Sequence, residues 1–233
     1  MLITVYHLVL GTVRACSNAL AVPIWWGVLQ GMASVLQGGP LFRAGVEGFR
    51  AGMDWTLDGP LGLICAGLFA VLGIVHAVRA ASGGAYDSPL GFVGFLLDHS
   101  WALPNTILAS IFATLTAGIA VDKTATKGSA RLVLQSGVFG PDYATTIGSV
   151  TAGTQVQAHE LQHVIQSWLF GPFFYPLYLA NYVVNLVPWW LLLKLLGMYP
   201  KAKIEGVVTY FTHGVYPFTL FEIWAYLVEG DPP

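Results

Sequence analysis

The chain has 233 residues, of which 55% are apolar and only 9% are charged, and its formal net charge is −2. Soluble domains carry about 25% charged residues, so this composition indicates a protein for which the lipid bilayer is part of the solvent. The near-neutral charge argues against a nucleic-acid-binding protein and against a basic peripheral membrane protein.

Three uncharged segments are candidate membrane-spanning helices, and each approaches the ~20 residues that cross ~30 Å of hydrocarbon. They are residues 15–42, 61–78 and 101–121. The first is the weakest candidate, because polar residues, a proline and several glycines interrupt it. Asp98 and His99 precede the third segment, and we expect them to be a boundary pair in solvent, with Asp98 as a helix cap or a contact of the site as the alternative. Residues 1–121 are therefore predicted to form about three spans.

Residues 122–153 have a different composition, with several basic residues followed by RLVLQSGVFGPDYATTIGSVTAG. The β-branched residues and the glycine-rich breaks predict two or three short strands in a hairpin or meander. An edge strand here could bind an extended peptide by β-augmentation, although an ordinary short strand would have the same sequence. The candidate substrate-binding residues are Thr146, Ile147, Gly148 and Ser149.

The sequence HELQH follows these strands, within TQVQAHELQHVIQSWLF at residues 154–170. On a helix, His159 and His163 lie one turn apart on the polar face, where two imidazoles can bind one Zn²⁺. In such motifs the glutamate is not a ligand, and Glu160 would act as general base on zinc-activated water. The motif therefore predicts a metal site with a catalytic glutamate.

A chance match must be weighed, because His-Glu-x-x-His is expected by accident in roughly one such sequence in a few hundred. The two histidines could then be a solvated or core pair. The amphipathic helix, the preceding strands and the cost of ionisable groups near a membrane favour the metal site.

A catalytic zinc site needs a third protein ligand beside an open position. A metzincin would have a histidine six residues after His163, where this chain has Leu169, and the inverted zincin motif does not match either. The residues alone leave several downstream candidates for the third ligand: Glu205, His213, Glu222, Glu229 and Asp231.

HELQH, an apolar hairpin and a later Glu-x-x-Ala form an order that resembles membrane gluzincins of the HtpX and CAAX-prenyl endopeptidase type. The resemblance implies that Glu222, in FEIWAY with Ala225, is the third zinc ligand. Those enzymes commonly continue with Asp where this chain has Tyr226. The second half of the chain more closely resembles bacterial multipass HExxH proteins, which share segments like HELQHVIQS, LFGPFFYPLYL, FEIWAY and an upstream ALPNT.

Site-2 proteases are a rival resemblance, because they pair an intramembrane HExxH with a Leu-Asp-Gly that supplies an aspartate ligand. This chain has Leu57-Asp58-Gly59, but it precedes HELQH, which reverses that family's order. Asp58 is more simply a carboxylate at the N-terminus of a helix.

Charge distribution gives a second constraint on the third ligand. With three early spans, Arg43, Arg50 and residues 123–131 share a side with HELQH, and the positive-inside rule assigns that side to the cytosol. If residues 169–197 form a single span, Glu222 lies across the bilayer from the histidines. A hairpin or re-entrant pair returns the tail to the same side, and the prolines in this segment suit a folded-back element.

The predicted fold is mainly α: a polytopic membrane protein with a small β-hairpin or meander before a zincin-like HExxH helix. Residues 122–233 would form the metal-site region, with an apolar helical hairpin at 169–197 and a C-terminal third-ligand helix.

The predicted function is a zinc metalloendopeptidase of the bacterial inner membrane, with its site toward the cytosol and a peptide or membrane protein as substrate. Candidate hydrogen-bond donors to the oxyanion are Tyr210, His213 and Tyr226. The alternatives are a non-catalytic membrane subunit with a structural or vestigial metal site and a site-2-protease-like enzyme.

Overall fold

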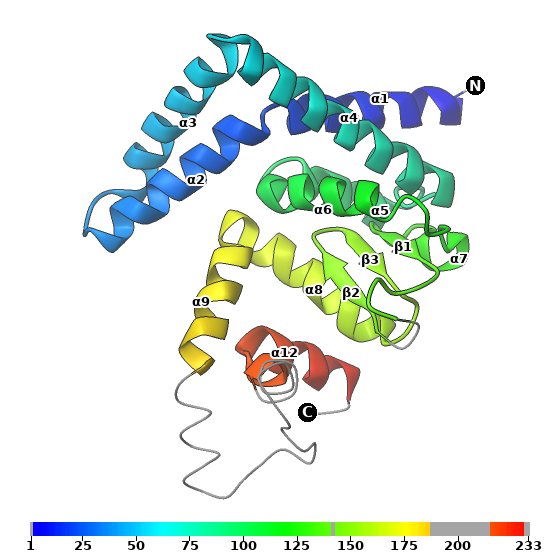
Figure 1. Cartoon of the computed structure of the whole chain (residues 1–233). Coiled ribbons are helices and arrows are strands. Elements are labelled where there is room, and N and C mark those ends of the chain that lie inside the picture. Colours follow the sequence, from blue (N-terminus) through cyan, green and yellow to red (C-terminus); the bar gives the residue numbers. More distant parts are fainter. Residues whose placement is uncertain (1, 141–142, 187–214, 231–233) are drawn as a thin grey trace, which may run out of the picture. The chain divides into compact units, whose positions relative to one another are not determined.

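The computed structural model describes residues 2–140, 143–186 and 215–230, and they are mainly helical (Figure 1). The chain divides into two compact units, Met1–Gln155 and Val156–Pro233. The short strands therefore group with the N-terminal helices, whereas the sequence analysis placed a boundary after residue 121. Each unit is described by itself below.

The first unit is built on two helix pairs, with α1 packed against α4 and α2 against α3. Helix α6 packs against α4 and against the small sheet. The bounds of its helices are α1 Leu2–Ala19, α2 Ala21–Leu36, α3 Leu41–Leu57, α4 Pro60–Gly83, α5 Pro89–Asp98, α6 Leu103–Leu115 and α7 Lys123–Thr126.

Glycines allow α2 and α3 to pack with their backbones close together. A Cβ atom on Gly52 would lie 2.7 Å from Pro23 Cα, and one on Gly48 would lie 2.7 Å from Gln30 Cβ. Close approach of helices through small residues is the packing mode of membrane helices, where no hydrophobic force drives the helices together.

The described residues differ from the three predicted spans. Helix α4 is long and apolar enough to cross a membrane, and α1 with α2 passes the same test only as a pair bent by 53°. The break in residues 15–42 has a local cause, because the ring of Pro23 excludes the carbonyl of Ala19 four residues earlier. The segment 101–121 holds only the 13-residue α6. By length and composition, the described residues contain one spanning-size helix, or two if the bent pair is one span.

An arginine of α4 binds carbonyl groups in the last turn of α6 and just beyond its end. The Arg79 guanidinium donates to the carbonyl oxygens of Ala113 and Ile119 and, at 3.3 Å, to Thr116 Oγ1. These groups would otherwise be unsatisfied at a helix C-terminus.

The strands form a three-stranded sheet of order β1-β3-β2, from β1 Leu132–Leu134, β2 Thr145–Ile147 and β3 Val150–Ala152. Strands β2 and β3 make the predicted hairpin, but β1 runs parallel to β3, so the sheet is mixed and is not a meander. The hairpin turns at Gly148, whose φ is +55° and whose Cβ would lie 2.6 Å from the carbonyl oxygen of Asn105. Only glycine fits that position without strain.

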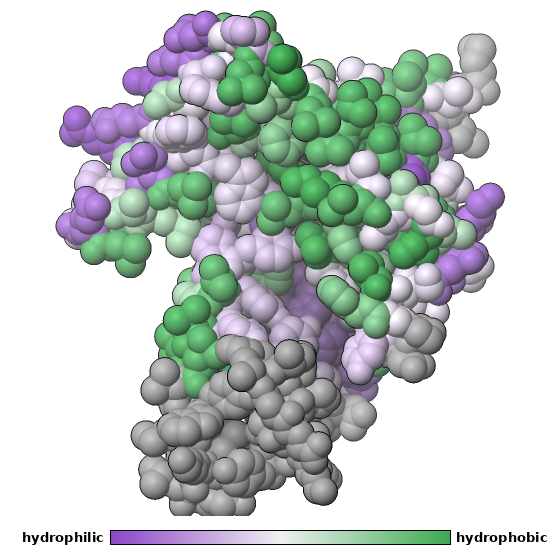
Figure 2. All heavy atoms as spheres, in the orientation of Figure 1, coloured by the Kyte–Doolittle hydropathy of each residue, from purple (hydrophilic) through white to green (hydrophobic). Residues whose placement is uncertain are grey.

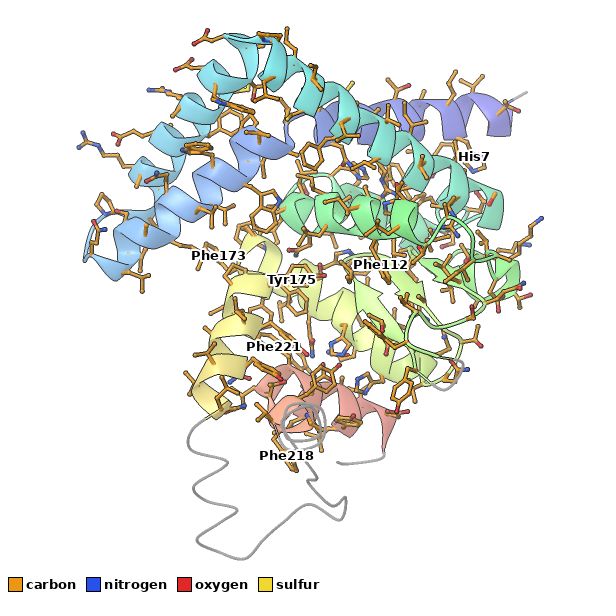
Figure 3. All side chains as sticks on the ribbon, viewed as in Figure 1. His7, Phe112, Phe173, Tyr175, Phe218 and Phe221 are labelled. Atoms are coloured by element: carbon orange, nitrogen blue, oxygen red, sulfur yellow. The ribbon has the colours of Figure 1, made fainter. Side chains whose placement is uncertain are left out.

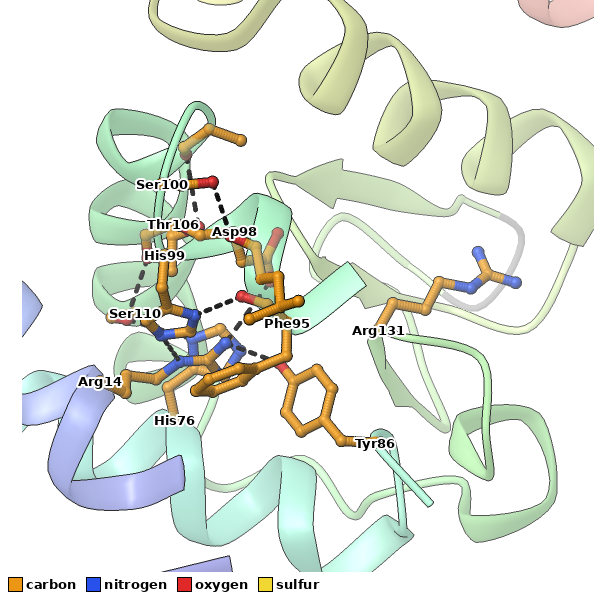
Figure 4. A network of polar contacts seen from close by, with 12 residues as sticks. Arg14, His76, Tyr86, Phe95, Asp98, His99, Ser100, Thr106, Ser110 and Arg131 are labelled. Atoms are coloured by element: carbon orange, nitrogen blue, oxygen red, sulfur yellow. Dashed lines mark hydrogen bonds and ion pairs between the residues drawn. The ribbon is translucent and has the colours of Figure 1, made fainter. Parts of the chain in front are cut away.

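Asp98 and His99 are not a solvated boundary pair, because they belong to a buried polar network around Arg14 (Figure 4). The fully buried Arg14 donates to Tyr86 Oη at 2.6 Å and to His99 Nε2 at 3.1 Å. Its guanidinium also lies 3.4 Å from a carboxylate oxygen of Asp98. A buried guanidinium requires such partners, and the sequence of α1 alone does not reveal them.

The second unit consists of three α-helices and two 3₁₀ turns in its described part: α8 Gln157–Phe170, η1 Gly171–Phe173, α9 Phe174–Leu186, η3 Tyr216–Phe218 and α12 Leu220–Glu229. Phe221 of α12, labelled in Figure 3, makes ring contacts with residues of α8 and α9. Its ring centroid lies 5.2 Å from that of Phe170, 5.4 Å from that of Phe174 and 5.6 Å from that of Tyr178. Of the predicted hairpin at 169–197, residues 187–197 lie outside the described residues.

Candidate metal centre

Helix α8 buries its polar face. His159, Glu160 and His163 are only 4–6% exposed, whereas Ile165 is 40% and Leu169 is 59% exposed. This is the reverse of a helix on a water-soluble surface, where the polar side chains face outward. The spacing of four residues places the two imidazoles one above the other, with ring centroids 4.9 Å apart.

Glu222 of α12 completes a three-residue group with these histidines. One carboxylate oxygen lies 3.0 Å from His159 Nε2, and the other lies 3.2 Å from His163 Nε2. One ligand atom from each residue can be chosen so that all three lie within 4.8 Å of one another, and all three residues are buried. Glu222 is therefore the one downstream candidate, among those the structure describes, that faces both Nε2 atoms.

Gln166 fixes the tautomer of His163. The Gln166 side-chain nitrogen donates to the carbonyl oxygen of Phe221 at 2.9 Å, so its side-chain oxygen faces His163 Nδ1 at 2.9 Å. An amide oxygen only accepts, and His163 Nδ1 must therefore carry the proton. Nε2 is then the nitrogen that either carries a second proton toward Glu222 or, in the neutral ring, offers a lone pair to a cation.

Two residues near the end of α12 contact the ring of His159. The Tyr226 ring packs edge-on against it, with centroids 4.6 Å apart. A Glu229 carboxylate oxygen lies 3.3 Å from His159 Nδ1, within ion-pair distance but without the alignment of a regular hydrogen bond. Tyr226, a candidate catalytic residue, thus lies beside a candidate ligand.

Tyr178 of α9 is hydrogen-bonded to the carboxylate of Glu222. Its hydroxyl donates to Glu222 Oε1 at 2.5 Å, a short contact of the kind that charged acceptors make. Burial and the Glu222 carboxylate together raise the pKa of Tyr178 far above its ordinary value, so this hydroxyl stays a donor.

The electrostatics of the group favour a positive charge between the histidines. Burial by itself lowers the pKa of His163, but its hydrogen bond to Glu222 and the carboxylates of Glu222 and Glu160 raise it to about 8. Burial by itself raises the pKa of Glu222, but its bonds to His159 and His163 outweigh that effect and lower it below the ordinary value.

The donor set fits a divalent metal ion. The Nε2 atoms of His159 and His163 are 3.2 Å apart, and the tautomer that Gln166 imposes directs one lone pair into this gap. Two imidazoles with a carboxylate are a zinc-type ligand set, and a cation here could take the place of the protons that now join these atoms. A buried His159–His163–Glu222 group can thus hold a metal ion.

The remaining predicted residues lie in three different places. Glu160 is buried on α8 beside His159, and its charge acts on His163. Thr146 and Ile147 lie on β2, an edge of the described sheet, with Gly148 and Ser149 at the hairpin turn. His213 and Tyr210, together with Glu205 and Asp231, fall outside the described residues.

Sequence reasoning did not find the supporting roles of Gln166, Tyr178 and Glu229. The spacing of three residues between His163 and Gln166 was a usable signal, because such residues are neighbours on a helix. Tyr178 had no signal in the sequence, since its contact depends on how α9 packs against α12.

The chain matches no known protein family, curated protein or solved structure. The chemistry of the site therefore rests on its own residues.

Proposed function

We propose that the protein is a membrane-embedded zinc metallopeptidase that hydrolyses peptide bonds near the membrane interface. The observation that carries this proposal is the convergence of two Nε2 atoms and the Glu222 carboxylate, with Glu160 buried beside them. A group of two histidines and one carboxylate from the protein leaves a fourth coordination position open, which is the arrangement of catalytic zinc sites.

Each residue has a separate task in this proposal. His159, His163 and Glu222 bind Zn²⁺, which when bound polarises a substrate carbonyl and acidifies water. Glu160 takes a proton from the attacking water and passes it to the leaving amine. Tyr178 keeps one oxygen of Glu222 engaged, which favours ligation through the other.

The membrane part of the proposal rests on exposed apolar surface. Figure 2 shows hydrophobic side chains gathered over α4 and its neighbours in the first unit, with hydrophilic ones at the outer ends. Only 17% of the most apolar stretch of α4 is buried. We place the protein in a bacterial inner membrane. The cytosolic side for the site was expected from three early spans, and the described residues contain one or two, so α4 separates Arg43 and Arg50 from Lys123 and Lys127. Arg131 is buried and does not count among these loop charges.

The proposal is preferred to a site-2-protease-like enzyme, because Glu222 is a carboxylate within reach of both histidines. Asp58 is the C-terminal cap of α3, and its backbone N–H bonds to the Asp54 carbonyl oxygen at 2.8 Å. The sequence analysis expected Asp58 at the N-terminus of a helix. In the structure it precedes Gly59, the N-cap of α4, and does not lie in the first turn of that helix.

The proposal is tested by comparing metal content with proteolysis in three purified forms. Wild type should hold about one zinc per chain and cleave a co-expressed membrane substrate. Glu160→Gln should keep the zinc and lose cleavage by at least 100-fold, because it removes the general base but no ligand. His159→Ala should lose both.

Wild type without zinc would refute the proposal, and a Glu160→Gln variant with normal cleavage would remove the catalytic role of Glu160. Zinc in wild type without cleavage of any peptide would support the non-catalytic alternative. Glu47→Gln is a matched control, since this exposed glutamate only pairs with Arg43 on its own helix.

A further inference from the structure

The rings of His159 and His163 are both held from behind by a side-chain oxygen, but by different chemistry. Each ring directs Nε2 toward Glu222 and Nδ1 away from it. The neutral amide oxygen of Gln166 lies 2.9 Å from His163 Nδ1, and a carboxylate oxygen of Glu229 lies 3.3 Å from His159 Nδ1. The charged member of this pair, Glu229, lies outside the HELQH and Glu-x-x-Ala motifs from which the site was predicted.

Glu229 is not an alternative ligand. Its oxygen contacts Nδ1 of His159, which is on the opposite side of the ring from the Nε2 atom that faces Glu222. The group of convergent ligand atoms contains His159, His163 and Glu222, without Glu229. A carboxylate in this position can act on a metal only through the imidazole.

The position of Glu229 in α12 also needs explanation. It is the last residue of the helix, and Gly230 follows it in the left-handed conformation that ends a helix. A carboxylate in the last turn is unfavourable, because the helix dipole places partial negative charge there. Glu229 is seven residues after Glu222, two helical turns along the same face, so α12 presents both carboxylates to α8. The side chain is only 19% exposed.

We propose that Glu229 is a positioning residue that holds His159 in the tautomer and orientation required for metal binding. This inference rests on the proposed metal site. The negative charge of Glu229, 3.3 Å from Nδ1, favours a proton on that nitrogen, and a proton there leaves the Nε2 lone pair for the ion. The negative charge also makes the imidazole a better donor to a cation, as carboxylate–histidine pairs do at zinc sites.

With Glu229 in this role, the residue at position 226 need not carry a charge. Tyr226, one turn after Glu222, packs its ring against His159 and contributes no carboxylate there. The charge that supports the histidine comes instead from one turn further along α12, at Glu229.

The experiment compares zinc affinity by chelator competition in wild type, Glu229→Gln and Glu229→Ala. Loss of such a partner typically weakens metal binding 10–100-fold, and we expect a loss in this range for Glu229→Ala. Glu229→Gln keeps the shape and an accepting oxygen, so it should recover part of the affinity. Glu47→Ala should bind zinc like wild type. An unchanged affinity in a folded Glu229→Ala protein would overturn the proposal.

A second measurement does not need the metal. In metal-free protein labelled with ¹⁵N-histidine, the ring shifts of His159 should show more protonation at Nδ1 in wild type than in Glu229→Ala, where the proton should move toward Nε2 and the Glu222 carboxylate. The absence of any redistribution would also overturn the role of Glu229. Wild type that binds no zinc would instead refute the proposed function, while the tautomer measurement would still report on Glu229. The two failures are therefore distinguishable.

Discussion

Several charged side chains of this protein are buried, and the polar partners of each one compensate for its loss of hydration. Arg14 lies between Tyr86, Asp98 and His99, and Glu222 lies between two imidazoles and a tyrosine hydroxyl. An unpaired charge at such sites would cost several kcal/mol, so removal of one partner is more damaging than removal of both. The same environment controls protonation, as His99 shows.

His99 should remain neutral well below the pH at which histidine normally titrates. Burial and the nearby Arg14 guanidinium lower the pKa of His99 to about 3. In the unfolded chain the ring takes up a proton near pH 6.5. The free energy of unfolding should therefore decrease as the pH falls from about 6.5 toward 3, because the unfolded state binds the additional proton.

The measurement is the ring ¹⁵N shift of His99 between pH 8 and pH 5, which should not change. A titration midpoint near pH 6.5 would contradict the expected environment. In His99→Gln, the part of the stability loss that begins near pH 6.5 should be smaller than in wild type.

At the scale of elements, the helices are specified by what they pack against more than by their own hydrophobic pattern. Helix α8 has a polar face that a sequence pattern assigns to solvent, yet that face is buried, packs with α12 and carries two of the candidate ligands. Helices α2 and α3 approach so closely that glycines are required at the contact. Such close packing leaves no room for a side chain at the contact, so one methyl group added to a glycine there would force the helices apart.

The substitution Gly52→Ala should destabilise the first unit, and Gly67→Ala on α4 should not. A Cβ at position 52 meets Pro23 Cα at 2.7 Å, whereas one at position 67 meets no atom within 4 Å. Overpacking typically costs about 1–3 kcal/mol. In a helix interior alanine is favoured over glycine by about 1 kcal/mol, so Gly67→Ala should be neutral or stabilising. Thermal unfolding in detergent measures both variants, and equal melting temperatures would show that α2 and α3 are not in close contact.

At the scale of the whole molecule, the exposed apolar surface would be energetically unfavourable if water surrounded the protein. Large apolar side chains are exposed along α4, among them Leu61, Ile64, Leu68 and Val78. Monomeric soluble proteins rarely expose contiguous apolar patches larger than a few hundred Å². A bilayer removes this cost, and it also explains why Ile165 and Leu169 face outward from a helix with a buried polar side.

The full chain, expressed in bacteria, should remain in the membrane pellet after extraction with alkaline carbonate and should enter solution only with detergent. Insertion of α4 buries its apolar side chains at roughly 25 cal/mol per Å² of surface, which is more than enough to resist extraction by high pH. Recovery of folded protein in the carbonate supernatant would contradict membrane insertion. Zinc measured on the detergent-solubilised protein would remain a valid test of the metal site in either case.

The sequence by itself determined the features that depend on neighbours along the chain. The mainly helical character, the β2–β3 hairpin, the long apolar α4 and the pairing of His159 with His163 all follow from composition or from a short period. The order of motifs pointed to Glu222 only through a resemblance, and the candidate roles at the site stay predictions.

Only the tertiary structure decided the features that depend on distant segments. It brought Glu222 of α12 within 3.0 Å of His159, across 63 positions of sequence, and it placed Tyr178 and Glu229 on that group. It also brought Asp98 and His99 together around Arg14. The physical reason is the same in each case. Long-range contacts arise when buried polar groups must find partners, and local periodicity contains no information about where in the chain those partners lie.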